Sequence, residues 1–157
     1  MEKCIIYYES WQLQCCGDPF SVGERVEWTC AKPDGSDNRH GITIDFVEEH
    51  HGDDTHWVTG TVTKIVAERS ESPNNGLPVG YDSVDVIHEE LQYADGWESE
   101  LDDDESTRRV FWGYIVELED ATVIKTRNRR NEEYEDIKEK LPKRIFLGRR
   151  KIIMHTK

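Results

Sequence analysis

Hydrophobic and polar positions alternate along most of the chain, and this period of two is typical of β-strands. Val26, Trp28 and Cys30, for example, occupy alternate positions of one such run. Glycine, proline and asparagine gather over residues 32–40 and 69–80, which predicts loops there. The pattern predicts strands over residues 4–8, 25–30, 41–48, 57–67, 83–88, 110–118 and 123–124, and a closing hairpin formed by residues 144–147 and 151–155.

The run over residues 110–118 is hydrophobic on both faces, which predicts a strand in the middle of a sheet. One face carries Val110, Trp112, Tyr114, Val116 and Leu118, and the other carries Phe111 and Ile115. Trp28 and Trp112 each alternate with hydrophobic neighbours, so we expect both indoles to be largely buried. A turn at residues 119–120 is expected to end this strand.

One segment has the period of an α-helix instead. Tyr134, Ile137, Lys138 and Leu141 recur three and four residues apart. Asn131 can cap this helix, acidic residues follow at its positive N-terminal end, and Pro142 stops it, which predicts a helix over residues 132–141. A second, acidic helix over residues 91–101 is a weaker alternative, because Gly96 interrupts it.

Many short strands and one helix near the C-terminus favour a closed or sandwiched sheet. We therefore expect a mainly β fold, namely a small, partly open antiparallel barrel of the SH3-like or OB-like (oligonucleotide-binding) type with one C-terminal helix. Residues 20–26 and 59–65 favour this choice, because each contains a glycine where a barrel strand can begin or bend. The length of 157 residues fits a single domain over residues 1–157.

The chain is strongly acidic, with a formal net charge of −13 at pH 7. Binding to nucleic acid or to an anionic membrane needs lysine and arginine to meet negative charge, so we expect neither as a partner. The charge is uneven, because residues 89–105 carry nine acids and no bases, whereas residues 143–157 carry six bases and no acids. Nucleic-acid binding through this basic C-terminal segment therefore stays an alternative, although the acids upstream can compensate its charge within one molecule.

The hydrophobic pattern predicts neither a signal peptide nor a membrane-spanning helix. The first hydrophobic run ends at Glu9, and no run approaches the roughly 20 residues that cross a bilayer. We therefore expect a cytoplasmic protein whose four cysteines are reduced. Such thiols can be buried hydrophobic groups, metal ligands or reactive nucleophiles.

The sequence Cys15-Cys16-Gly17 has two interpretations. As a turn, it would place Gly17 at a positive φ and turn one thiol inward as a small hydrophobic group. As a metal site, it would hold zinc together with imidazole ligands, since thiolate and imidazole suit tetrahedral zinc. The candidate zinc ligands are Cys15, Cys16, His50 and His51. Adjacent residues of a strand point to opposite faces, so we expect such a site to use one of these cysteines, one of these histidines, and then Cys30 or His56.

Residues 11–28 read W-Q-x-Q-C-C-G-x-P-F-x-x-G-x-x-V-x-W, and Glu48-Glu49-His50-His51-Gly52 and Gly60-Thr61-Val62 follow. This opening resembles that of an uncharacterised bacterial family, a domain of unknown function. The resemblance covers about the first 65 residues and does not extend to the acidic and basic segments. It implies common descent and no particular activity.

No established catalytic motif is present in the sequence, such as H-E-x-x-H, G-x-S-x-G or a phosphate-binding glycine loop. The favoured interpretation is a non-catalytic binding or interaction module, monomeric or homodimeric, with a protein partner and no cofactor. One alternative is a zinc- or thiol-dependent site in which Cys16 acts as a metal ligand or as a nucleophile beside a histidine.

Overall fold

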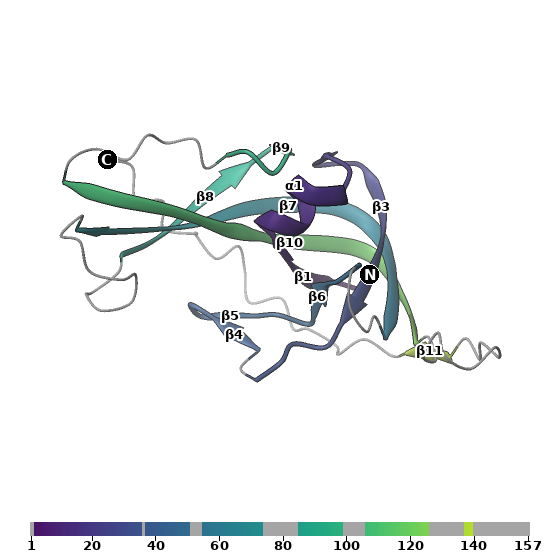
Figure 1. The fold of residues 1–157 in the computed structure, drawn as a ribbon. Coiled ribbons are helices and arrows are strands. Elements are labelled where there is room, and N and C mark those ends of the chain that lie inside the picture. The colour runs from purple at the N-terminus through teal and green to yellow at the C-terminus, as the bar shows by residue number, and fades with distance from the viewer. Residues whose placement is uncertain are drawn as a thin grey trace.

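The computed structural model of the chain describes residues 2–35, 37–50, 55–73, 85–98, 106–125 and 137–139. Within these residues the fold is mainly β with one short helix, as Figure 1 shows. The elements are β1 (Cys4–Glu9), α1 (Ser10–Cys16), β2 (Phe20–Ser21), β3 (Arg25–Ala31), β4 (Asn38–Arg39), β5 (Ile42–Thr43), β6 (Phe46–Glu48), β7 (His56–Pro73), β8 (Asp85–Leu91), β9 (Tyr93–Ala94), β10 (Thr107–Lys125) and β11 (Ile137–Glu139).

Seven strands form one strongly curled sheet in the order β11-β10-β1-β6-β3-β7-β8, and β10 also pairs with β7. The pairings between β10, β1, β6, β3 and β7 therefore form a closed circuit around the core. The contact between β1 and β6 is parallel, and the other pairings of the sheet are antiparallel. Two further sheets have two strands each, β2 with β9 and β4 with β5.

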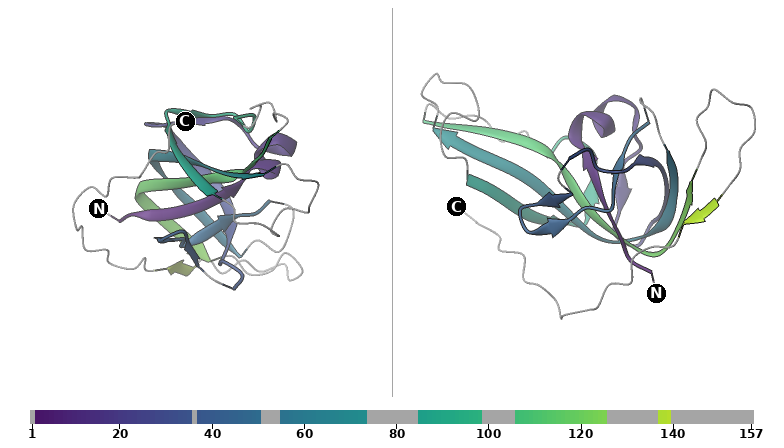
Figure 2. Two further views of the ribbon diagram at one scale, coloured as in Figure 1. Left: turned by 90° about the vertical axis from the view of Figure 1, so that its left-hand side faces the viewer. Right: turned by 90° about the horizontal axis from the view of Figure 1, so that it is seen from below.

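The two longest strands, β7 and β10, pair along their whole length, from His56 opposite Lys125 to Pro73 opposite Thr107. Their inner halves take part in the closed circuit. Their outer halves continue beyond it with β8 as a three-stranded arm, which projects to the left in Figure 1 and to the upper left in the right-hand view of Figure 2. The register shifts three times along the ladder, and such bulges bend a strand pair.

The curled sheet buries hydrophobic side chains on both of its faces. Cys4, Ile6 and Tyr8 of β1 point into the inner core, and Ile5 and Tyr7 point to the outer face. The outer cluster also contains Ile44, Val66 and Ile115, with Ile42 and Val47 packed against it. The segment that carries β4 and β5 therefore covers the middle of the outer face, which explains why both faces of the central strands are hydrophobic.

Several predicted strands are confirmed, namely those over residues 4–8, 25–30, 57–67, the described part of 83–88, and 110–118. The predicted strand over residues 41–48 is instead broken, because Ile42 and Thr43 pair with β4 and only Phe46–Glu48 joins the large sheet. The turn predicted at residues 119–120 is wrong, since β10 continues through a bulge there. The loop predicted over residues 69–80 is wrong as far as residue 73, because β7 extends to Pro73.

The predicted C-terminal helix is wrong at residues 137–139, which form β11 against Val123, Ile124 and Lys125. Backbone pairing with the end of β10 outweighs the helical period there. The rest of that helix, the predicted hairpin at 144–155 and the basic segment lie outside the described residues. The alternative helix over residues 91–101 is also wrong as far as residue 98, since β8 ends and β9 forms within it.

The structure contains a short helix, α1, that the hydrophobic pattern did not predict. It follows β1 directly, and its first residue is preceded by Glu9 in an extended conformation without a side-chain cap. Gln12 and Leu13 are buried beneath it. With only seven residues and two buried positions, α1 is too short to show a helical period in the sequence.

Both Trp28 and Trp112 were expected to have largely buried indoles. The burial of Trp28 confirms this only in part, and the exposure of Trp112 contradicts it. Trp28 is partly buried, and its ring lies 5.1 Å from that of Tyr8 and 4.9 Å from that of Phe20. Trp112 is 42% exposed, because the register of β10 shifts between Phe111 and Gly113. This bulge turns the Trp112 side chain to the outer face and leaves Phe111 in the core.

Gly113 is required at this bulge because β1 crosses close to it. A Cβ at this position would collide with the carbonyl oxygen of Tyr8 and lie 3.0 Å from Cα of Glu9. We predict that Gly113→Ala destabilises the fold by about 3 kcal/mol, since the obstructing atoms are backbone. Chemical denaturation would measure this, with Gly60→Ala as comparison. A Cβ at Gly60 would meet its nearest atoms at 3.0 to 3.3 Å, so a Gly113 effect smaller than that of Gly60 would contradict the prediction.

Candidate functional site

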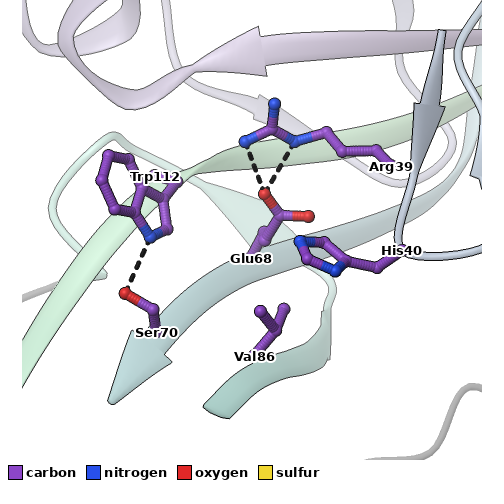
Figure 3. A pocket seen from close by; sticks show the side chains of 6 residues that line it. All are labelled: Arg39, His40, Glu68, Ser70, Val86 and Trp112. Atoms are coloured by element: carbon purple, nitrogen blue, oxygen red, sulfur yellow. Dashed lines mark hydrogen bonds and ion pairs between the residues drawn. The ribbon is translucent and has the colours of Figure 1, made fainter. Parts of the chain in front are cut away.

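A hollow of about 330 Å³ lies on the outer face of the three-stranded arm, where the β4–β5 segment approaches it (Figure 3). This volume suits a small molecule or one side chain of a peptide. Six residues from four strands and one turn line it: Arg39, His40, Glu68, Ser70, Val86 and Trp112.

Strand register places these side chains together. Glu68 of β7 is opposite His88 of β8, and Ser70 is opposite Val86, so the four side chains form two adjacent rows on one face. The bulge in β10 adds Trp112 to the same face, and its indole Nε1 donates a hydrogen bond of 2.8 Å to Oγ of Ser70. The arm therefore supplies the floor of the hollow and one wall.

Glu68 is the charged centre of the hollow, although its side chain is only 1% exposed. Nε and Nη2 of Arg39 both lie 2.7 Å from its Oε1, and Nε2 of His88 lies 3.1 Å from its Oε2. Burial alone would raise the pKa of Glu68, but the hydrogen bonds from His88 and Arg39 outweigh burial and lower it. Glu68 is therefore a permanent carboxylate with both oxygens bound.

Arg39 reaches Glu68 across the ring of Tyr7, with its guanidinium carbon 3.8 Å from the ring centroid. The turn after Arg39 is tight, because His40 and Gly41 both have positive φ, 50° and 85°. Oδ1 of Asn38 accepts a hydrogen bond from the backbone N–H of Gly41 and closes the turn. This turn places the His40 ring at the edge of the hollow, 6.1 Å from the ring of His88.

The polar groups that line the hollow are largely bound to one another. Both oxygens of Glu68 are occupied and its pKa is lowered, so it is a poor general base at neutral pH. The hydroxyl of Ser70 accepts the indole N–H of Trp112. The ring of Trp112 is thus exposed, and the hydrogen bond from its indole N–H to Ser70 fixes its orientation.

A second polar region, inside the sheet, contains residues that the sequence singled out. Glu48 is almost fully buried, and its Oε1 lies 2.6 Å from Nδ1 of His50. Burial raises the pKa of Glu48 to about 7, against the opposing hydrogen bond from His50. Its second oxygen, Oε2, is buried without a hydrogen-bond partner in the structure.

The structure gives the Cys15-Cys16-Gly17 segment a form that differs from the predicted turn. Cys15 and Cys16 are exposed at the end of α1 instead of in a turn, and Gly17 is extended with φ of −84°. Gly17 is needed for space instead, because a Cβ there would collide with the hydroxyl of Tyr8. A hydrogen bond with Cys15 and the charge of Glu48 raise the pKa of Cys16, so the same electrostatic environment contains Cys16 and the Glu48–His50 pair.

These positions do not strengthen the zinc or thiol hypotheses. Among the residues that the structure describes, no three His, Cys, Asp or Glu side chains gather as metal ligands do, and His51 lies outside those residues. Cys30 is in the inner core, and His56 is buried against the ring of Phe46. The raised pKa of Cys16 disfavours the thiolate that a nucleophile requires. None of the four cysteines forms a disulfide.

The lining residues of the hollow were not among the candidates that the sequence predicted. Trp112 was assigned to the core by its alternation with hydrophobic residues. Among the lining residues, only Glu68 could have been suspected from the sequence. It lies between Val66 and Ser70 in a long strand, and a carboxylate that is buried there must have a polar or charged partner. Arg39 and His40 come from a predicted loop, and nothing in their spacing indicates contact with β7.

The profile of a family of unknown function, DUF6578, matches residues 2–120. The chain belongs to this family. The predicted resemblance to a family of unknown function is thus confirmed, and the match extends well beyond the first 65 residues. All six lining residues of the hollow lie within it, as does the acidic segment, whereas the basic segment 143–157 lies beyond it. No curated protein and no solved structure matches the chain.

The described part of the chain contains no helix that is long and hydrophobic enough to span a membrane.

Arg39 is predicted to stabilise the fold by holding the buried charge of Glu68. Arg39→Met should lower the free energy of unfolding at pH 7 by roughly 2 kcal/mol, because Glu68 keeps only its bond to His88. Since the pKa of Glu68 is lowered in the folded state, this stabilisation is present above the ordinary carboxyl pKa and is lost as the pH falls. Urea denaturation from pH 7 to pH 3 measures both effects.

A matched control for Arg39→Met is Arg109→Met on the same arm, where the paired carboxylate of Glu71 is 13% exposed against 1% for that of Glu68. The control should cost less, about 1 kcal/mol. In a double-mutant cycle, Glu68→Leu together with Arg39→Met should cost clearly less than the sum of the single changes. Additive single effects would show that the pair is not coupled.

Glu48 is predicted to reduce stability at neutral pH. Its pKa is about 7 in the folded chain and 4.5 ordinarily, so between these values the folded state binds more protons than the unfolded state. Stability should therefore fall as the pH rises from 4.5 to 7, by about 3 kcal/mol from this group. Glu48→Gln should flatten this slope between pH 5 and pH 8, whereas Glu2→Gln, at an exposed position, should leave it unchanged. An unaltered slope in Glu48→Gln would refute the assignment.

Proposed function

We propose that this chain is a non-catalytic, cytoplasmic binding module and that the hollow beside Trp112 is its ligand site. The exposed indole of Trp112, held in one orientation by Ser70, carries the proposal. A large hydrophobic ring that is fixed and only partly covered gives a ligand contact area at little cost in conformational entropy.

The other walls of the hollow suggest the class of ligand. Nη1 of Arg39 and the ring nitrogens of His40 make no hydrogen bond to any residue that the structure describes, so Nη1 and the protonated ring nitrogen of His40 can donate to a ligand. Val86 adds a hydrophobic contact on the β8 side. These features favour a planar ring that stacks on Trp112 and carries an oxygen acceptor facing Arg39 and His40.

The electrostatics of the hollow support binding over catalysis. The guanidinium of Arg39 balances the charge of Glu68, and His88 hydrogen-bonds its second oxygen, so this pair adds no excess negative charge despite the acidity of the whole chain. An acceptor group on the ligand would therefore meet donors and not a bare carboxylate. The buried ion pair also holds the lining rigid, which lowers the entropic cost of binding.

We also infer that the curled sheet is a small, partly open barrel of the SH3-like or OB-like type. The closed circuit of pairings through β10, β1, β6, β3 and β7 supports this proposal. The single hydrophobic core inside that circuit supports it as well.

Small carboxylic acids can test the proposed ligand class. Benzoate should bind with a millimolar Kd and shift the indole N–H resonance of Trp112, because its ring can stack while its carboxylate meets Arg39 and His40. Cyclohexanecarboxylate has the same charge but no flat ring, so it should bind several-fold more weakly. Trp112→Leu should abolish benzoate binding, as followed by the backbone amide resonances of Ser70 and Val86, whereas Trp57→Phe, which removes an indole bonded to Glu27 elsewhere, should not. Equal binding of the two acids, or a response centred on Trp57, would refute the proposal.

A further inference from the structure

A second surface, separate from the hollow, exposes two tryptophans among carboxylates. Trp11 of α1 is 48% exposed, and Trp97, which follows β9, is 54% exposed. Glu9, Asp95 and Glu98 accompany them and complete what we call the aromatic–acidic surface. Single exposed hydrophobic residues are ordinary, but hydrophobic side chains exposed together and rimmed by polar residues mark interaction sites.

The two tryptophans flank one contact between distant parts of the chain. Nε2 of Gln14 donates a hydrogen bond of 2.6 Å to the carbonyl oxygen of Gly96, which directly precedes Trp97. Gly96 has φ of 91°, and a Cβ there would lie 3.2 Å from the backbone nitrogen of Gln14. Trp11 lies three residues before Gln14 on α1, so the side chains of both start from the same side of the helix.

Hydrogen bonds fix the segment that presents Trp97. Oδ1 of Asp95 accepts the backbone N–H of Trp97 at 2.8 Å, and Oε1 of Glu98 accepts that of Asp95 at 3.0 Å. The hydroxyl of the fully buried Tyr114 accepts the N–H of Gly96 at 2.7 Å and donates to Glu98. The segment is therefore anchored to the inner core, and Trp97 is displayed from a rigid turn.

The charged side chains that define this surface, Glu9, Asp95 and Glu98, are all acidic. Residues 10–24, which include α1, contain no lysine or arginine. The indole N–H of Trp11 donates to the carboxylate of Glu9, so an acid lies beside the ring itself. Carboxylates beside indole rings attract cations through Coulomb forces and cation–π contacts together, and they repel phosphate groups.

We propose that the aromatic–acidic surface binds a lysine- or arginine-rich segment of a partner protein. The cationic groups would pack over Trp11 and Trp97 and pair with Glu9, Asp95 and Glu98. The charge complementarity selects this occupant over nucleic acid or an anionic membrane, both of which carry the wrong sign. The proposal is independent of the ligand site at Trp112.

The experiment uses the full chain and a synthetic peptide that alternates lysine or arginine with leucine. Fluorescence anisotropy of the labelled peptide measures Kd at two salt concentrations, and a peptide with glutamate in place of the bases is the matched probe. The basic peptide should bind, and added salt should weaken its binding. The acidic peptide should not bind.

Substitutions separate this surface from the general acidity of the chain. Trp97→Ala and Trp11→Ala should each weaken binding of the basic peptide about tenfold. Trp57→Ala removes an indole that is bonded to Glu27, outside both surfaces, and should leave that binding unchanged. Circular dichroism checks that the variants fold. Equal losses for all three tryptophans, or for none, would overturn the proposal, because either result means attraction by overall charge alone.

The basic segment of this chain is a competing occupant that the same assay can detect. A peptide of residues 143–157 carries six bases and no acids. It should bind no more tightly than the designed basic peptide if the surface is made for a partner protein. Binding at least ten times tighter, and lost in Trp97→Ala, would assign the surface to this chain's own segment and overturn the proposal.

Discussion

The pairing of β7 with β10 is the constraint on which the rest of the structure depends. From His56 opposite Lys125 to Pro73 opposite Thr107, the two strands share one ladder. Its inner half is closed into a circuit by β3 on one edge and β1 on the other, while its outer half binds β8 and becomes the arm. The inner half of the β7–β10 ladder thus belongs to the core, and its outer half carries the candidate ligand site. The packing of the core therefore sets the position of the hollow.

The bulge at Trp112 shows where prediction from sequence reaches its limit. Alternation identified most strands correctly because residues such as Ile6, Tyr8 and Val26 follow the period of two without a break. A bulge shifts that period by one residue. Apart from the neighbouring Gly113, no residue in the sequence indicates that a bulge occurs here. Tertiary contact has the same effect at residues 137–139, where pairing with β10 overrides a helical pattern. The strands could therefore be predicted, with the faces of residues such as Tyr114 and Ile115, but not the faces of Phe111 and Trp112 at the bulge.

The candidate site was harder to predict than the fold because its members come from separate segments. The cysteine and histidine clusters attracted attention as uncommon residues close in sequence. The structure does bring Cys16 near the Glu48–His50 pair, yet it uses Cys30 and His56 as core residues. Arg39 and Glu68 are common residue types 29 positions apart, and only the crossing of the β4 segment over β7 joins them. A site built from such common residues can be recognised only when the strand register is known.

Two buried carboxylates in the same sheet show how partners, rather than burial, decide the role of a charge. Glu68 and Glu48 are about equally inaccessible, at 1% and 2% exposure. Glu68 meets a guanidinium and an imidazole, so its charge is stabilised and its pKa is lowered. Glu48 meets one imidazole and keeps an unbonded oxygen, so its pKa rises to about 7. The outer face therefore holds a carboxylate whose charge is kept by its partners, whereas the interior holds a carboxyl whose charge depends on pH near neutrality.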